Sequence, residues 1–322
     1  MVVSRSIPSS ACLVVAALAG LACGSDEDAP TAPQPTPPSG IVAFSSERDG
    51  NPEVYTIRGD GTELTRLTSA TNADDGEPAW SPTGARIAFS SDRDGDFEIY
   101  AMNENGTGVT RLTNNAAEDA SPSWSPDGRR IAFYSDRAAG NFDIYVMDAD
   151  GSDVTRLTTG ASVESGPRWS PNGQQILFQS DRDGNFELYA MNADGSNVRR
   201  LTNHPAADLF GAWSPDGQRI AFQSQRFGEF EILVMNADGT NIVRLTNNTA
   251  RDNYPTWSHD GRRIAVHTDR DAGNFEIYSI LAADGTDPVR LTNHPAFDAF
   301  PAYRPAVAAA PQMTQASMLS RR

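Results

Sequence analysis

Hydrophobic and polar positions along residues 41–305 repeat with a period close to 45 residues. One aromatic residue marks each copy of the repeat, and the six are Trp80, Trp124, Trp169, Trp213, Trp257 and Tyr303. The intervals between them are 44, 45, 44, 44 and 46 residues. Such a period, with short strand-like segments inside it, is typical of a β-propeller with one blade per repeat.

One copy of the repeat predicts four short strands. The first strand covers 122–124, and a Ser-Pro-Asp-Gly turn follows it, in which Pro fixes φ and Gly accepts a positive φ. The second covers 131–133 and the third 142–147, after which an Asp-Ala-Asp-Gly turn leads to the fourth at 154–158. Large apolar side chains lie on both faces of the third strand, which indicates a sheet buried between two neighbours.

The two ends of the repeat predict a closed ring. The repeat begins in a second strand at 41–44 and stops after a first strand at 301–303. A blade built from both ends would hide the sheet edges that an open array exposes. The predicted fold is therefore all-β: a six-bladed β-propeller of four-stranded blades over 41–305, closed by a composite N- and C-terminal blade.

The repeat resembles that of the TolB-type propeller. The resemblance covers 41–305 and rests on Trp-Ser-Pro-Asp-Gly-Arg-Arg-Ile-Ala-Phe at 124–133, Ile-Tyr-Val-Met-Asp at 144–148 and Arg-Leu-Thr at 156–158. TolB is a periplasmic protein whose propeller binds a peptidoglycan-associated lipoprotein and follows a folded α/β domain. This chain resembles the propeller and not the whole protein. The resemblance implies a periplasmic compartment and a protein or peptide as partner.

The N-terminus predicts export. Residues 1–22 read as a signal peptide, because an apolar run too short to span a bilayer follows Arg5. The run ends in Gly-Leu-Ala-Cys, which resembles the lipobox of bacterial lipoproteins and implies lipidation of Cys23. Cleavage after Ala22 by an ordinary signal peptidase is the alternative. No acid follows Cys23 directly, so we expect a periplasm-facing lipoprotein of the outer membrane.

Composition indicates disorder at both ends of the propeller. It also indicates an acidic surface and a monomeric protein. Residues 23–40 are Pro-rich and predict a disordered tether, and 306–322 predict a disordered tail. The net charge is −16, and all 26 basic residues are Arg, which argues against nucleic acid as a partner. A strongly charged surface also resists self-association.

An acid and an Arg recur in every copy. The acids lie five residues before the marker aromatics: Asp75, Asp119, Glu164, Asp208, Asp252 and Asp298. The Arg residues follow the second strands: Arg48, Arg93, Arg137, Arg182, Arg226 and Arg270. One interpretation is a carboxylate ring at the channel mouth that binds Ca²⁺ or a cationic partner. The other, favoured by recurrence in all six copies, is that the acids cap turns and pair with the Arg residues, so no cofactor is predicted.

No catalytic residues and no metal site are predicted. The chain has neither G-x-S-x-G nor H-E-x-x-H. His204, His267 and His294 lie in successive blades, but His204 and His294 are expected far apart at the rim. A non-catalytic scaffold is therefore the predicted function, and a propeller enzyme acting on carbohydrate or peptide with a metal at the channel mouth is the alternative.

Apolar residues break the sixfold pattern on one face. Three residues before the marker stand Glu77, Ser121 and Gly166, then Phe210, Tyr254 and Phe300. Phe227 replaces a small residue in the loop that follows one of the second strands and contains the recurring Arg. We predict a partner site made of Phe210, Phe227, Tyr254 and Phe300 beside Asp208, Asp252 and Asp298, which suits a segment with apolar and cationic side chains. Packing between blades beneath the loops is the alternative.

Overall fold

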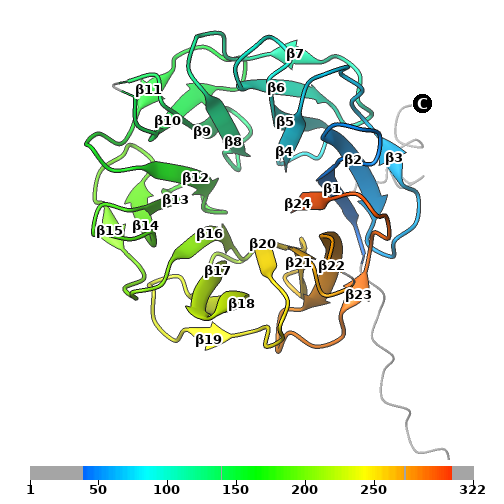
Figure 1. The fold of residues 1–322 in the computed structure, drawn as a ribbon. Helices are drawn as coiled ribbons and strands as arrows, with labels where there is room; N and C mark the ends of the chain where they lie inside the picture. The colour runs from blue at the N-terminus through cyan, green and yellow to red at the C-terminus, as the bar shows by residue number, and fades with distance from the viewer. Residues whose placement is uncertain (1–38, 139, 272, 307–322) are drawn as a thin grey trace, which may run out of the picture. The chain divides into compact units, whose positions relative to one another are not determined.

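The computed structural model describes residues 39–138, 140–271 and 273–306, which form 24 strands in six four-stranded sheets. The sheets are arranged in a ring around a central axis (Figure 1). This confirms the predicted all-β six-bladed propeller. The predicted signal peptide, Cys23 and nearly all of the tether and tail lie outside the described residues. Within the part described, no helix is long and apolar enough to cross a membrane.

Each blade places one strand at the channel and three successively farther out. The innermost strands are β4 (Asp75–Trp80), β8 (Asp119–Trp124), β12 (Glu164–Trp169), β16 (Asp208–Trp213), β20 (Asp252–Trp257) and β24 (Asp298–Tyr303). The second strands are β1 (Ile41–Ser46), β5 (Arg86–Ser91), β9 (Arg130–Ser135), β13 (Gln175–Ser180), β17 (Arg219–Phe227) and β21 (Arg263–Thr268). The third strands are β2 (Glu53–Arg58), β6 (Glu98–Asn103), β10 (Asp143–Asp148), β14 (Glu187–Asn192), β18 (Glu229–Asn236) and β22 (Glu276–Leu281). The outermost are β3 (Thr65–Arg66), β7 (Thr110–Arg111), β11 (Thr155–Arg156), β15 (Arg199–Arg200), β19 (Val243–Arg244) and β23 (Val289–Arg290).

The predicted composite blade closes the ring. Its strand order is β24-β1-β2-β3, so the innermost strand comes from the C-terminal end of the repeat. Tyr303 pairs with Val42, and Asp298 pairs with Ser46, in antiparallel register. Arg48 donates to both carboxylate oxygens of Asp298 at 3.0 and 2.9 Å. The two ends of the propeller are thus joined by a backbone ladder and an ion pair.

The hydrophobic core consists of layers between neighbouring blades. The large side chains buried in these layers include an aromatic at the same position of five second strands: Phe44, Phe89, Phe133, Phe178 and Phe222. Each is fully buried, and burial of one such side chain stabilises the fold by about 1.5–3 kcal/mol. The channel wall is therefore supported from behind by packed apolar layers.

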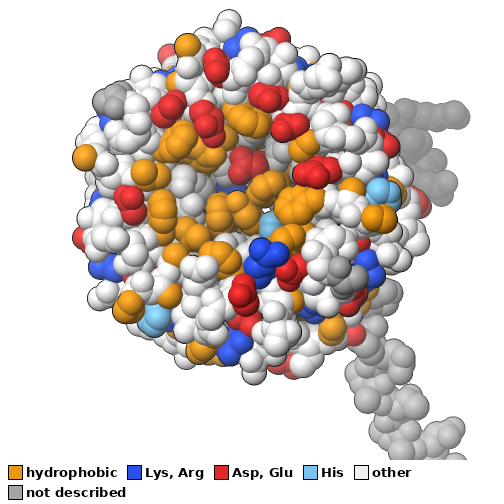
Figure 2. All heavy atoms as spheres, in the orientation of Figure 1, with side chains coloured by type: hydrophobic (Ala, Val, Ile, Leu, Met, Phe, Trp, Pro, Cys, Tyr) orange, Lys and Arg blue, Asp and Glu red, His pale blue; other side chains and the backbone are white. Residues whose placement is uncertain are grey.

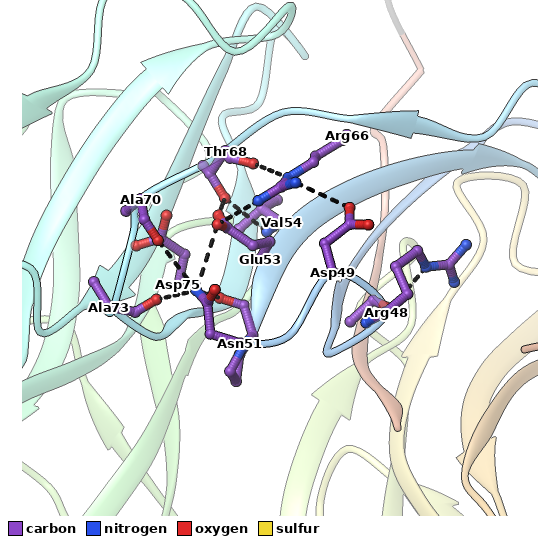
Figure 3. A network of polar contacts seen from close by, with 12 residues as sticks. Arg48, Asp49, Asn51, Glu53, Val54, Arg66, Thr68, Ala70, Ala73 and Asp75 are labelled. Atoms are coloured by element: carbon purple, nitrogen blue, oxygen red, sulfur yellow. Dashed lines mark hydrogen bonds and ion pairs between the residues drawn. The ribbon is translucent and has the colours of Figure 1, made fainter. Parts of the chain in front are cut away.

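The Arg-Leu-Thr motif holds the outer strand to the third strand. In the composite blade, Arg66 Nη2 donates to Glu53 Oε1 at 2.7 Å, and Thr68 Oγ1 donates to Glu53 Oε2 at 2.5 Å (Figure 3). Thr68 Oγ1 also accepts the Val54 N–H at 2.9 Å. Asn51 donates to the Ala73 carbonyl, which fixes the loop that enters the next innermost strand. The recurring polar residues of the repeat thus anchor the loops that surround the channel.

Each innermost strand contains a β-bulge, and in four blades the bulged residue lines the channel. The pairing register shifts in every one, for example between Leu209 and Ala212. The bulged residues have φ between +49° and +61°, and they are Glu77, Ser121, Gly166, Phe210, Tyr254 and Phe300. We call these six residues the bulge ring. Positive φ is uncommon outside Gly, and a bulge re-aims the side chain it carries.

Four backbone N–H groups of the bulge ring, those of Ser121, Phe210, Tyr254 and Phe300, donate to side chains of the preceding blade. Three of these bonds are Phe210 N–H to Gln179 Oε1 at 2.8 Å, Tyr254 N–H to Gln223 Oε1 at 2.9 Å and Phe300 N–H to His267 Nδ1 at 3.3 Å. A buried N–H left without an acceptor would destabilise the fold. The second strand of one blade therefore supports the bulge of the next.

Candidate functional site: the channel and its two mouths

The loops after the second and fourth strands form one face of the propeller, which we call the loop face. Figure 2 shows that hydrophobic side chains fill the centre of this face. Asp and Glu side chains gather around the upper part of its mouth, over the region of β1, β5 and β9 in Figure 1. The turns after the first and third strands form the opposite face, which we call the turn face.

Three aromatics of the bulge ring meet inside the channel. The rings of Phe210 and Tyr254 stack with centroids 3.8 Å apart, and Phe300 meets Tyr254 edge-on at 4.6 Å. All three side chains are half-buried. The structure thus brings together the three residues singled out by comparing the copies. It places them in the channel, on the innermost strands, and not on the loops.

Phe227 does not join this aromatic trio. Its hairpin is longer than those of the other blades, because β17 and β18 continue to Phe227 and Glu229 around Gly228. The ring is 51% exposed and lies under the Arg244 guanidinium of the outermost strand, 4.4 Å away. The predicted four-residue aromatic site is therefore a trio in the channel and a separate residue at the rim.

The recurring acids are enclosed by the recurring Arg residues. All six acids have no exposed surface. The pairs, with N–O distances of 2.5–3.1 Å, are Arg48–Asp298, Arg93–Asp75, Arg137–Asp119, Arg182–Glu164, Arg226–Asp208 and Arg270–Asp252. This is the structural pairing favoured above. Asp208, Asp252 and Asp298 therefore present no accessible carboxylate to a partner, because each side chain is buried against its own blade.

A different set of acids lines the loop-face mouth. A hollow of about 260 Å³ is lined by four acids and by aromatic rings: Glu47, Asp74, Glu77 and Glu118, with Phe97, Tyr134, Phe297 and Phe300. We call it the acidic hollow, and no Arg is among the residues that line it. Comparison of the copies could have found it, because the position before each recurring acid varies. That position holds Asp74, Glu118, Val163, Ala207, Arg251 and Phe297.

Three carboxylates of the acidic hollow lie where negative charge is disfavoured. Burial is the main cause that raises the pKa of Asp74, Glu77 and Glu118. The neighbouring charges of Asp92 and Asp136 raise the pKa of Asp74 and of Glu118 further. A cation brought into the hollow would compensate these desolvated acids.

The other half of the bulge ring is polar. Glu77 Oε2 accepts the Ser121 N–H at 2.8 Å and the Ser90 hydroxyl at 3.2 Å. Arg168, on the same side of the channel, donates from Nη1 to Ser121 Oγ at 3.3 Å. The channel is thus constricted by aromatic rings from three blades and by polar side chains from the other three.

A second chamber lies between the bulge ring and the turn face. Its volume is about 260 Å³, and all five Trp residues of the chain line it together with Arg168 and the aromatic trio. Four of these Trp residues also line the mouth on the turn face, a hollow of about 380 Å³. We call the inner space the Trp chamber. Arg168 was not among the predicted site residues, although an Arg occurs at its position in one copy of the repeat only.

The three His residues of the alternative enzyme site make separate local bonds. His204 Nδ1 accepts the Ala206 N–H at 3.1 Å, and His294 Nδ1 accepts the Ala296 N–H at 3.2 Å. His267 Nδ1 accepts a bulge N–H, and burial lowers the pKa of this imidazole to about 3. Among the described residues, no three His, Cys, Asp or Glu side chains are grouped so that they could hold a metal ion.

Comparison with solved structures agrees with this architecture. TolB from Acinetobacter baumannii is similar over 84% of this chain and 68% of its own length, with 23% identity and a TM-score of 0.74. An oligogalacturonate lyase in complex with manganese is similar over 80% and 74%, with 15% identity and a TM-score of 0.58. A puromycin hydrolase is similar over 80% and 46%, with 15% identity and a TM-score of 0.57. At these identities the likeness shows the fold alone.

The sequence itself shows the family. No curated protein matches the chain significantly. The family model of the TolB beta propeller domain matches residues 14–137, 75–164, 118–209 and 203–306, which together span most of the chain. These segments include every blade seen in the structure. The chain therefore belongs to the TolB beta propeller domain family.

Proposed function

We propose that this protein is a non-catalytic interaction module of the bacterial cell envelope, which captures a protein or peptide segment in the acidic hollow. One observation carries the proposal: within a frame that repeats six times, acids and aromatic rings line one hollow, and no Arg is among its lining residues. Residues that depart from the repeat are not required by the fold that all six blades share. Their concentration at one mouth is what a partner site requires.

The chemistry of the hollow favours a cationic segment with apolar neighbours. Phe297 is 36% exposed at the mouth, and Phe300 forms part of the floor. Aromatic faces attract ammonium and guanidinium groups, and desolvated carboxylates strengthen that attraction. A Lys or Arg side chain flanked by apolar residues satisfies both parts of the hollow. The alternative enzyme function gains no specific support, because the three His residues are engaged separately.

Replacement of Phe297 by Ala is expected to weaken partner binding by about thirtyfold, the equivalent of about 2 kcal/mol for an aromatic anchor. The partner is first identified by a photocrosslinking residue placed at Glu47 in intact envelopes. Its purified binding segment is then titrated against each variant by calorimetry. Glu118→Gln is expected to slow association and to reduce its salt dependence.

Phe227→Ala is the matched control, because Phe227 is also an exposed Phe of the loop face but lies outside the hollow. It is expected to leave the affinity unchanged. Equal affinities of wild type and Phe297→Ala would reject the acidic hollow as the binding site. Crosslinking of small neutral sugars and no protein would instead favour the carbohydrate enzyme.

Membership of the family supports an envelope location, and the lipobox-like segment extends this to a lipoprotein. We expect Cys23 to carry acyl chains. Several chains would anchor the protein stably, whereas one chain would bind the membrane reversibly. A radioactive fatty acid should label the wild type and not Cys23→Ser, and the variant should leave the membrane fraction. Equal labelling of both proteins would contradict lipidation at this residue.

A further inference from the structure

Arg168 is a single-copy departure from the repeat on the wall of the Trp chamber. It lies directly before the marker aromatic of its blade, at a position that faces the channel. The equivalent residues of the other blades are small or medium-sized: Ala79, Ser123, Ala212, Thr256 and Ala302. The fold therefore does not need a charge or a long side chain at this position.

The guanidinium of Arg168 is a desolvated cation with few partners. Nη1 donates to the Pro167 carbonyl at 2.8 Å and to Ser121 Oγ at 3.3 Å. Among the described carboxylates, none lies within the 4.0 Å that defines an ion pair with it. Burial lowers the pKa of this guanidinium, and the charge of Glu77 opposes the shift only in part. A charge held in this way is costly unless a counter-charge reaches it.

Most of the rest of the chamber is aromatic and Pro surface, and Glu77 is the one acid among the residues that line it. The five Trp rings and the aromatic trio enclose about 260 Å³ around Arg168. Trp80, Trp124 and Trp169 continue into the mouth on the turn face, so the chamber opens away from the acidic hollow. A ligand that enters from the turn face meets aromatic walls first and the guanidinium at depth.

We propose that the Trp chamber binds a small carboxylate carried on a flat apolar group, with Arg168 as its counter-charge. The planar guanidinium fork matches a carboxylate, and Trp rings stack on flat apolar bodies. The chamber opens on the turn face and the acidic hollow on the loop face, and Glu77 and Phe300 of the bulge ring line both. One mouth is thereby suited to a cation and the other to an anion, and the inference goes beyond the proposed function.

The test uses intrinsic fluorescence, because every Trp of the chain lines the chamber. Phenylacetate, phenylacetamide and phenethylamine are titrated into the full-length protein, with excitation selective for Trp and with calorimetry in parallel. Phenylacetate is expected to give a saturable change. The neutral amide and the amine are expected to bind at least about tenfold more weakly, as loss of a charged hydrogen-bonding pair implies.

Arg168→Ala is expected to reduce phenylacetate affinity at least about tenfold and to retain the fold, since Ala79 and Ala212 occupy the same position elsewhere. Arg168→Lys keeps the charge without the fork and should bind with intermediate affinity. Arg130→Ala is the matched control: Arg130 stacks on Trp169 at 4.7 Å, outside the chamber lining. It should alter emission and leave affinity unchanged.

Three results would each overturn the proposal. The first is equal affinity for phenylacetate and phenylacetamide, which would make the chamber merely apolar. The second is unchanged phenylacetate binding by folded Arg168→Ala and Arg168→Lys. The third is the absence of both heat and a fluorescence change when wild type is titrated to millimolar phenylacetate.

Discussion

Replacing Arg48 by Met is expected to lower the free energy of unfolding by about 3–5 kcal/mol, the usual consequence of breaking a buried ion pair from one side. Asp298 has no exposed surface, and both of its oxygens accept from Arg48. Burial already raises the pKa of Asp298 despite this partner. Without Arg48, the carboxylate that joins β24 to β1 would remain buried and unpaired. Urea unfolding at neutral pH measures the loss.

Arg58→Met is the control for this variant. Arg58 pairs with Glu63 at 2.7 Å, but the two side chains are 54% and 66% exposed. Exposed pairs of this kind contribute little to stability, because water and salt screen them. Addition of Asp298→Asn to Arg48→Met should recover part of the stability, because the unpaired charge is then absent. A loss for Arg48→Met no larger than that for Arg58→Met would contradict the importance of this pair for closing the ring.

His267→Gln is expected to remove much of the protein's sensitivity to acid. The buried imidazole has a pKa of about 3, and burial is the main cause. An unfolded His titrates near pH 6.5, so the unfolded state binds more protons than the folded state between about pH 3 and 6.5. Stability from this group is therefore full above pH 6.5 and falls as the pH decreases. The loss is about 2 kcal/mol between pH 7 and pH 5 and approaches about 5 kcal/mol near pH 3.

Gln is the informative replacement because it occupies the equivalent position in two other blades. Gln179 and Gln223 accept the equivalent bulge N–H groups in two other blades. A Gln at 267 should keep the acceptor for Phe300 N–H and lose the titration. Urea midpoints of wild type and variant, compared from pH 7.5 to pH 5, should diverge as the pH falls, while all other groups cancel in the difference. Parallel curves for the two proteins would show that the pKa of His267 is not lowered in the folded state.

The sequence was sufficient to predict the blades and their closure, because each blade is a local unit written six times. The Trp-to-Trp interval defines the unit, and the half-repeats at 41–44 and 301–303 can be completed only by each other. The pairing of recurring acid with recurring Arg followed from the same comparison. It is confirmed by pairs such as Arg226–Asp208 at 2.5 Å. Recurrence separates structural polar residues from variable ones.

The position of the aromatic trio could not be predicted, because it depends on backbone geometry. Only Gly166 signals a positive φ by its residue type, whereas Tyr254 and Phe300 adopt that conformation without any such signal. The acids that line the hollow were not predicted, although two of them lie only one position before the recurring acids in the sequence. Asp74 and Asp75 are adjacent, yet the bonded Asp75 is fully buried and Asp74 lines the hollow. Strand alternation sends neighbours to opposite sides, and boundaries of short strands are hard to fix from sequence.

The composite blade also sets an order of assembly. The bond between Arg48 and Asp298 spans 250 residues, so it forms only after the chain has closed a very large loop. Until residues 298–303 dock, β1 offers an unpaired edge to any other chain with a free strand. The propeller is therefore completed by the last strand of its repeat, and the intermediate that lacks this strand is the species most open to aggregation. A short peptide with the sequence of β24 should compete for this edge during refolding and act as an inhibitor of propeller maturation.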